Sequence, residues 1–137
     1  MARIDWALVC DLAFFDRQDR LCIVGIVQKL STADLPIAIG QVMLVAHLTD
    51  IQPVDEVEIS VAVVTPSGLF TTPRSSDCVA VEVAHEYVLV VLRELPLHEE
   101  GIYKFQLALQ GGFVASVDVP VRMLDRPVPA TARQRWQ

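Results

Sequence analysis

The sequence lacks the residue patterns from which most catalytic and metal sites are built. Its three cysteines, Cys10, Cys22 and Cys78, have neither the Cys-x-x-Cys spacing nor the Cys/His pairing of zinc sites. The six glycines are scattered, and no phosphate-binding loop, dinucleotide-binding fingerprint, nucleophile elbow or HExxH motif occurs. The chain is therefore predicted not to be an enzyme and to bind no cofactor.

Histidine is also sparse, with His47, His85 and His98 spread over three predicted strands or their ends. A three-histidine zinc site would need these strands to converge, and no pattern in the sequence predicts that. Cys10 and Cys22 lie in apolar segments, where a thiol behaves as a small hydrophobic side chain with a raised pKa. We therefore predict no catalytic residue and no metal ligand.

Long hydrophobic runs are missing as well. No apolar run reaches the roughly 18 residues of a membrane-spanning helix. The N-terminus, MARIDWALV, lacks the basic and apolar regions of a secretory signal. We expect a cytoplasmic protein with free thiols and no membrane partner. A Cys10–Cys22 bridge between adjacent strands is the alternative.

Positive charge is scarce until the end of the chain. Residues 1–125 hold 8 Lys and Arg against 17 Asp and Glu, a net charge of −9, whereas residues 126–137 hold three Arg and no acid. The acidic body argues against nucleic-acid binding, which needs clustered basic residues. We expect a single domain over residues 1–125 and a flexible basic tail over 126–137, which could contact an acidic surface.

What the sequence has in abundance is alternation of apolar and polar residues. The period of two predicts β-strands, and no helical period of useful length occurs. Turn-forming residues separate the apolar segments at short intervals, which is typical of an antiparallel, immunoglobulin-like β-sandwich of about eight strands. The predicted strands cover residues 6–14, 21–30, 37–49, 56–64, 78–84, 86–95, 102–109 and 113–121, with a ninth near 69–71.

Four acidic residues open the chain: Asp5, Asp11, Asp16 and Asp19. Asp5 and Asp11 are six residues apart, about 20 Å along a strand, so they cannot act as a carboxylate pair. Asp16 and Asp19 flank a predicted hairpin turn, where such side chains bond to nearby backbone. The acids are thus predicted to form the solvent-exposed face and the turn of a half-buried strand.

Two segments carry a resemblance to a known family. The strand DWALVCD (residues 5–11), followed by LCIVGI (21–26), resembles the opening of a small bacterial family of unknown function (DUF6941-like). The later segment from Glu100 to Phe105 and the glycine-rich hairpin after it also fit. The resemblance would cover about residues 4–123. It implies a β-sandwich without an established activity, and no functional residue can be transferred.

The segment GIYKF (101–105) is separately similar to the start of a late strand in many immunoglobulin-like domains. There a tyrosine often anchors a corner through its hydroxyl group. Tyr103 is predicted either to form such a corner or to be an ordinary core residue.

The hydrophobic fraction, 53%, is high for a chain without a membrane segment. The segments 21–27 and 87–92 are apolar on both faces, so their second face is covered either from within the chain or by another subunit. We predict a homodimer or another protein complex as the main interpretation. The predicted association residues are Ile23, Val24, Ile26, Val88, Val90 and Leu92.

The sequence is therefore interpreted as a non-enzymatic cytoplasmic interaction module that self-associates through apolar sheet faces. One alternative is a small-ligand-binding protein or enzyme whose site lies in loops at one end of the sandwich, around residues 50–55, 71–77 or 96–100. Another alternative is a subunit of a larger phage-like or secretion-like assembly.

Overall fold

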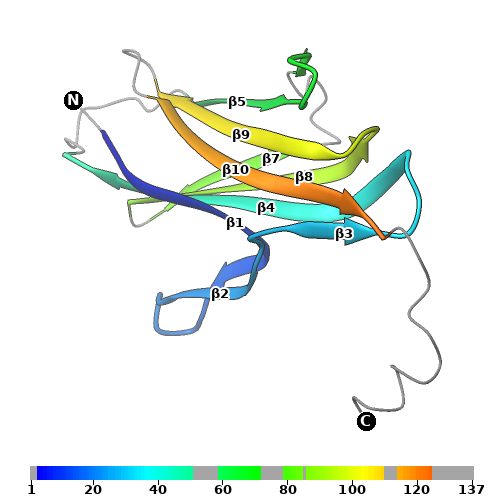
Figure 1. Ribbon diagram of the computed structural model, residues 1–137. Helices are drawn as coiled ribbons and strands as arrows, with labels where there is room; N and C mark the ends of the chain where they lie inside the picture. Colours follow the sequence, from blue (N-terminus) through cyan, green and yellow to red (C-terminus); the bar gives the residue numbers. More distant parts are fainter. Residues whose placement is uncertain (1–2, 51–58, 72–78, 85, 110–113, 125–137) are drawn as a thin grey trace, which may run out of the picture.

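The computed structural model describes residues 3–50, 59–71, 79–84, 86–109 and 114–124, which form two stacked five-stranded sheets (Figure 1). The first sheet has the order β2-β1-β4-β8-β7 and the second β3-β10-β9-β5-β6. Neighbouring strands are antiparallel, except that β3 runs parallel to β10. The strands are β1 (Arg3–Phe15), β2 (Leu21–Ile26), β3 (Leu30–Thr32), β4 (Ile37–Thr49), β5 (Ile59–Val64), β6 (Phe70–Thr71), β7 (Val79–Ala84), β8 (Tyr87–Leu97), β9 (Gly101–Leu109) and β10 (Val114–Met123).

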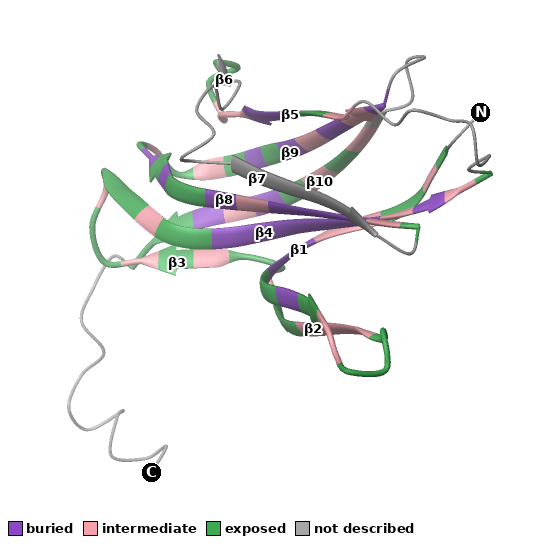
Figure 2. Ribbon diagram, turned by 180° about the vertical axis from the view of Figure 1, so that it is seen from behind, coloured by how far each residue is buried: buried purple, intermediate pink, exposed green. Residues whose placement is uncertain are grey.

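The predicted antiparallel β-sandwich is thereby confirmed. The ninth strand predicted near residues 69–71 is β6, and one further short strand, β3, is present. The alternation in β9 buries one side of the strand and exposes the other, as Figure 2 shows. Apolar side chains from both sheets meet in one core, because each strand directs every second residue inward. This core includes Val42, Leu44, Val61, Val63, Val88, Val90, Leu92, Tyr103, Phe105, Leu107 and Val119.

The strand order is that of an immunoglobulin-like domain. In the order in which they lie in the first sheet, β1, β4, β8 and β7 occupy the positions of strands A, B, E and D. In the second sheet β5, β9 and β10 occupy those of C, F and G. The hydroxyl oxygen of Tyr103 accepts hydrogen bonds from the backbone N–H of His98 (3.0 Å) and Glu99 (3.3 Å). This is the predicted tyrosine corner. Phe105 stands two residues further on, where antibody domains have a disulfide-forming cysteine.

An added hairpin distinguishes this chain from the simple sandwich. β1 pairs with β4 as far as Cys10 and with β2 from Cys10 to Phe15, so its second half leaves the sheet. We call residues 11–26 the arm. At its base Gly25 has φ +68°, a left-handed conformation that favours glycine, and a Cβ atom there would also crowd the side chain of Asp11.

The arm folds beneath the outer face of the first sheet (Figure 2). Ala13, Phe15, Leu21 and Ile23 point toward that face, and the backbone N–H of Ala13 donates to the sulfur of Met43 at 3.2 Å. The outer-face residues that the arm covers are Met43, Val45, Tyr87, Leu89 and Val91. The second apolar face of β8 is thus covered from within the chain.

One predicted strand differs from the structure. The single strand predicted over 21–30 is two strands in different sheets, because the chain leaves the arm after Ile26.

Cys10 and Cys22 are free thiols, as expected, and face Ile26 and Phe14 across the arm rather than each other. Cys78 and the predicted tail at 126–137 lie outside the described residues.

Candidate functional site

The outward side of the arm is an exposed apolar surface. Leu12 and Phe14 of β1 are each 43% exposed, Val24 is 52% exposed and Ile26 is 58% exposed. Leu12 is paired with Val24 across the hairpin, so these side chains lie on the same side of it. We call the set of Leu12, Phe14, Val24 and Ile26 the arm face.

The turn at the tip of the arm is tightly bonded. Oδ1 of Asp16 accepts from the backbone N–H of Gln18 and of Arg20, each at 2.9 Å, and Oδ2 accepts from Nε of Arg20 at 2.8 Å. The backbone hydrogen bond from Arg20 is the main reason why the pKa of Asp16 is lowered. Asp19 adopts φ 57°, a turn conformation that aspartate tolerates. The predicted turn role of Asp16 and Asp19 is confirmed.

The structure divides the predicted association residues into two groups. Val88, Val90 and Leu92 are at most 2% exposed, because their side chains point between the two sheets, so they offer no surface in the folded chain. Ile23 is half-buried between the arm and the first sheet. Val24 and Ile26 belong to the arm face.

A second group of side chains lies around His47 on the same face of the sheet, next to the arm, where the ring of Phe15 lies 6.1 Å from that of Tyr87. The register of β1 and β4 shifts between Ile4 and Trp6, so Asp5 is an extra residue in a β-bulge. Ile4 still packs into the core, whereas Trp6 pairs with His47. The ring of Trp6 stacks on that of His47, with centroids 6.0 Å apart and an interplanar angle of 19°.

Two carboxylates flank the imidazole ring. Oδ2 of Asp5 is 3.2 Å from Nδ1 of His47, and Oε2 of Glu86 is 3.6 Å from Nε2. Glu86 occupies a turn with φ 70° just before β8, and the ring of Tyr87 lies 4.9 Å from that of His47. The carboxylates remain accessible, since the side chains of Asp5 and Glu86 are 54% and 65% exposed. We call Asp5, Trp6, His47, Glu86 and Tyr87 the acidic aromatic site.

Sequence reasoning missed this site. It placed Asp5 on the solvent-exposed face of the strand, and the side chain of Asp5 is indeed 54% exposed. It did not predict the bulge or the contact between Asp5 and His47. The sequence showed only that His47 shares a strand face with Met43 and Val45. This alternation did not identify the residues of β1 that contact His47. His85, the neighbour of Glu86, lies outside the described residues.

Metal-binding side chains do not gather at either surface. No three His, Cys, Asp or Glu side chains in the described part of the chain are placed to hold a metal ion together. Burial raises the pKa of the Cys10 thiol, which makes it a poor nucleophile. Within the same part of the chain, no helix has the length and apolar character needed to cross a membrane.

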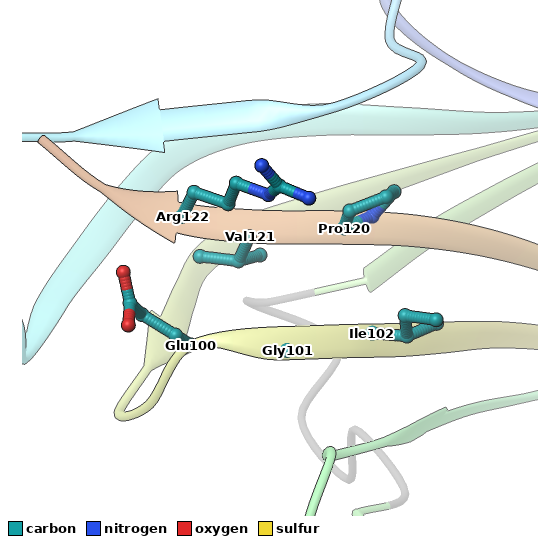
Figure 3. Close-up of a pocket in the computed structure, with 6 residues that line it drawn as sticks. All are labelled: Glu100, Gly101, Ile102, Pro120, Val121 and Arg122. Atoms are coloured by element: carbon teal, nitrogen blue, oxygen red, sulfur yellow. The ribbon is translucent and has the colours of Figure 1, made fainter.

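A shallow groove of about 330 Å³ lies between β9 and β10 (Figure 3). Its lining is largely backbone and the apolar side chains of Ile102, Pro120 and Val121. Glu100 and Arg122 diverge at its end, and Oε1 of Glu100 already accepts from the backbone N–H of Met123 at 2.6 Å. Converging polar groups, which a ligand site needs, are not found in this groove.

The predicted loop site is only partly described. In the 96–100 loop, the hydroxyl group of Tyr103 bonds to the backbone N–H groups of His98 and Glu99. Residues 51–55 and 72–77 lie outside the described residues.

A family model described as a family of unknown function (DUF6941) matches residues 5–122. No curated protein matches the sequence.

Among solved structures, the M1 domain from titin is similar over 72% of this chain and 87% of its own, at 9% identity and a TM-score of 0.36. The Ig1 domain of mouse SynCAM 2 is similar over 73% of this chain and 94% of its own, at 13% identity and a TM-score of 0.34.

Proposed function

The chain belongs to the family of unknown function (DUF6941), and we propose that it is a non-enzymatic interaction module that self-associates through its arm face. The observation that carries this proposal is the exposure of Leu12, Phe14, Val24 and Ile26 together on one hairpin. Apolar side chains exposed singly need no explanation, whereas a group of them on one projecting element is typical of an interaction surface.

A two-fold contact between copies fits this surface best. Two arm faces packed against each other would form a local two-layer β structure with a spacing of about 10 Å, and each face would be the partner of the other. The same four residues would then be buried on both chains.

The size of the surface sets the expected strength of the contact. Full burial of one Val, Leu, Ile or Phe side chain contributes about 1.5–3 kcal/mol. The four side chains are 43–58% exposed, so eight of them in a pair of chains contribute about 6–12 kcal/mol. Association costs about 4–15 kcal/mol in lost freedom of motion, so we expect a weak dimer whose population depends on concentration.

Light scattering coupled to size exclusion over a wide concentration range tests the proposal. The wild-type mass is expected to rise from 15.2 kDa toward twice that value. Val24→Glu should keep the mass at 15.2 kDa, because a charge buried in the contact is left unpaired. The matched control is Ile102→Glu, since Ile102 is 49% exposed on the outer face of the second sheet.

The proposal fails if Val24→Glu associates as the wild type does while retaining the wild-type melting temperature. It also fails if the control dissociates to the same degree as Val24→Glu.

We also propose that the module works in the cytoplasm. Two free thiols, one of them buried beneath the arm at Cys10, support a reducing environment. Cell fractionation with an antibody against the chain tests this, and recovery outside the cytoplasmic fraction would contradict it.

A further inference from the structure

The first sheet ends on one side at β7, and within the described part of the chain β7 bonds only to β8. The other edge strands are less suited to pairing with a further strand. β3 has three residues and β6 has two, whereas β2 belongs to the arm, which leaves the sheet. β7 has six residues in one unbroken register with β8 and holds no proline or lysine, the residues that commonly protect an edge strand. It is therefore the edge best suited to pairing.

The hydrogen bonds of β8 determine which backbone groups of β7 face this edge. The N–H of Leu48 donates to the carbonyl oxygen of Glu86 at 2.7 Å, and β4 and β8 keep the same register as far as Arg93. Bonding alternates along an antiparallel strand, so the even residues of β8 bond to β4 and the odd ones to β7. The β7 partners of these odd residues are Ala84, Glu82 and Ala80. The backbone N–H and C=O groups of the other residues, Val79, Val81 and Val83, therefore point away from β8.

A second copy of β7 can satisfy all of these outward groups. When two β7 strands pair antiparallel about a two-fold axis at Val81, this residue lies opposite the partner's Val81, and Val79 lies opposite the partner's Val83. Each of the three pairs of outward residues then exchanges two backbone hydrogen bonds, about six in total. The pattern of free donors and acceptors on β7 is thus complementary to itself.

Charge distinguishes this register from its neighbour. An axis at Glu82 would form about four bonds and would place Glu82 directly opposite the partner's Glu82. Like charges directly opposite each other destabilise a strand pair. With the axis at Val81, Glu82 lies opposite the partner's Ala80, and no acid of β7 faces another. The sequence VAVEVA of β7 therefore favours one register.

We propose that the β7 edges of two copies pair about Val81 and join their first sheets into one continuous sheet. The contact shares no residue with the arm face, so this inference goes beyond the proposed function and does not depend on it. A chain that uses both contacts can link arm-face pairs into a longer series. The edge contact is the weaker of the two, because its backbone groups exchange bonds to water for bonds to each other. Covalent trapping, which captures short-lived pairs, is therefore the appropriate measurement.

The trapping experiment uses the full chain in a background that isolates the β7 edge. Every sample carries Val24→Glu, which removes association through the arm face. Cys22→Ser and Cys78→Ser are also present in every sample, so the only native thiol left is Cys10, which is buried. One protein then receives Ala80→Cys and a second protein Glu82→Cys.

The register about Val81 predicts which samples form a disulfide. It places Ala80 opposite the partner's Glu82 in a pair without backbone bonds, with Cα atoms about 4.5 Å apart, which a disulfide can bridge. Two copies of either position are diagonal neighbours about 7–8 Å apart, which is too far. Oxidation with diamide should therefore cross-link an equimolar mixture of the two proteins at least about ten times faster than either protein alone, as measured by non-reducing electrophoresis.

A pair of substitutions at Val81 tests the role of the backbone. Val81→Pro removes an N–H that points to the partner and not to β8, so it should slow cross-linking of the mixture about tenfold. Val81→Ala is the matched control, because it also shortens the side chain but keeps the N–H, and it should leave the rate unchanged. Thermal melting establishes that both variants are folded.

The inference is overturned if the mixture cross-links no faster than the single variants, or if Glu82→Cys alone cross-links fastest. It is likewise overturned if a folded Val81→Pro variant cross-links as fast as Val81→Ala. None of these results concerns the arm face, which is tested separately by comparing the wild type with Val24→Glu.

Discussion

A single extra residue determines the chemistry at the start of β1. Without the bulge, Asp5 would alternate regularly with Ile4 and Trp6 and would lie away from His47. With the bulge, Asp5 lies 3.2 Å from the ring of His47 while Ile4 still packs into the core. Bulges commonly re-aim side chains in this way next to functional surfaces.

Asp16 should titrate at lower pH than an ordinary aspartate. Its pKa is lowered below the usual 3.8 mainly by the backbone N–H of Arg20, a bond that exists only in the folded turn. Because the folded pKa is below the unfolded one, the stabilising contribution is complete above the unfolded pKa and is lost as pH falls through the folded one. Carboxyl carbon chemical shifts measured against pH check this, and a midpoint at or above 3.8 would contradict it.

The two described cysteines should differ in reactivity. Cys10 is fully buried with a raised pKa, whereas Cys22 is half-exposed on the arm. We expect a maleimide to label Cys22 at least about tenfold faster, because only accessible thiolates react. Peptide mapping by mass spectrometry at successive times measures both rates, and equal labelling would show that the arm does not protect Cys10.

At the scale of elements, the tyrosine corner links β8 to β9. Tyr103→Phe leaves the N–H groups of His98 and Glu99 without their acceptor, which should lower the free energy of unfolding by about 1–3 kcal/mol. Denaturant titration measures the change. Tyr87→Phe is the matched control, since it preserves the ring contacts around His47. A loss for Tyr103→Phe no larger than that of the control would show that the corner is unimportant.

Most strands were predictable from the sequence, because the alternation of apolar and polar residues that predicts a strand lies within the strand itself. In β9 the apolar residues at every second position are the buried ones, so the sequence of the strand alone predicts its burial pattern. The arm was less predictable, because Leu12, Phe14 and Val24 look like core residues of a regular strand. Nothing local to the segment 21–30 signals that the chain leaves one sheet at Ile26 and joins the other at Leu30.

At the scale of the whole molecule, surfaces depend on contacts between distant segments. The sequence correctly indicated that 87–92 is apolar on both faces. It could not show that residues 13–23 cover one of them, because docking of the arm follows from the path of the chain. The acidic aromatic site likewise combines β1, β4 and the start of β8, which only the assembled sheet brings together.

The attachment of the arm has a further consequence. β2 hydrogen-bonds to β1 alone within its sheet, and the arm otherwise rests on side-chain contacts with β4 and β8. The hairpin can therefore lift as one cooperative unit while the sandwich stays folded, a form of local unfolding. In the lifted state Met43, Val45 and Leu89 lose their cover, and the same surfaces of a neighbouring molecule can accept the hairpin in exchange. The arm thus gives this fold an inherent route to domain swapping.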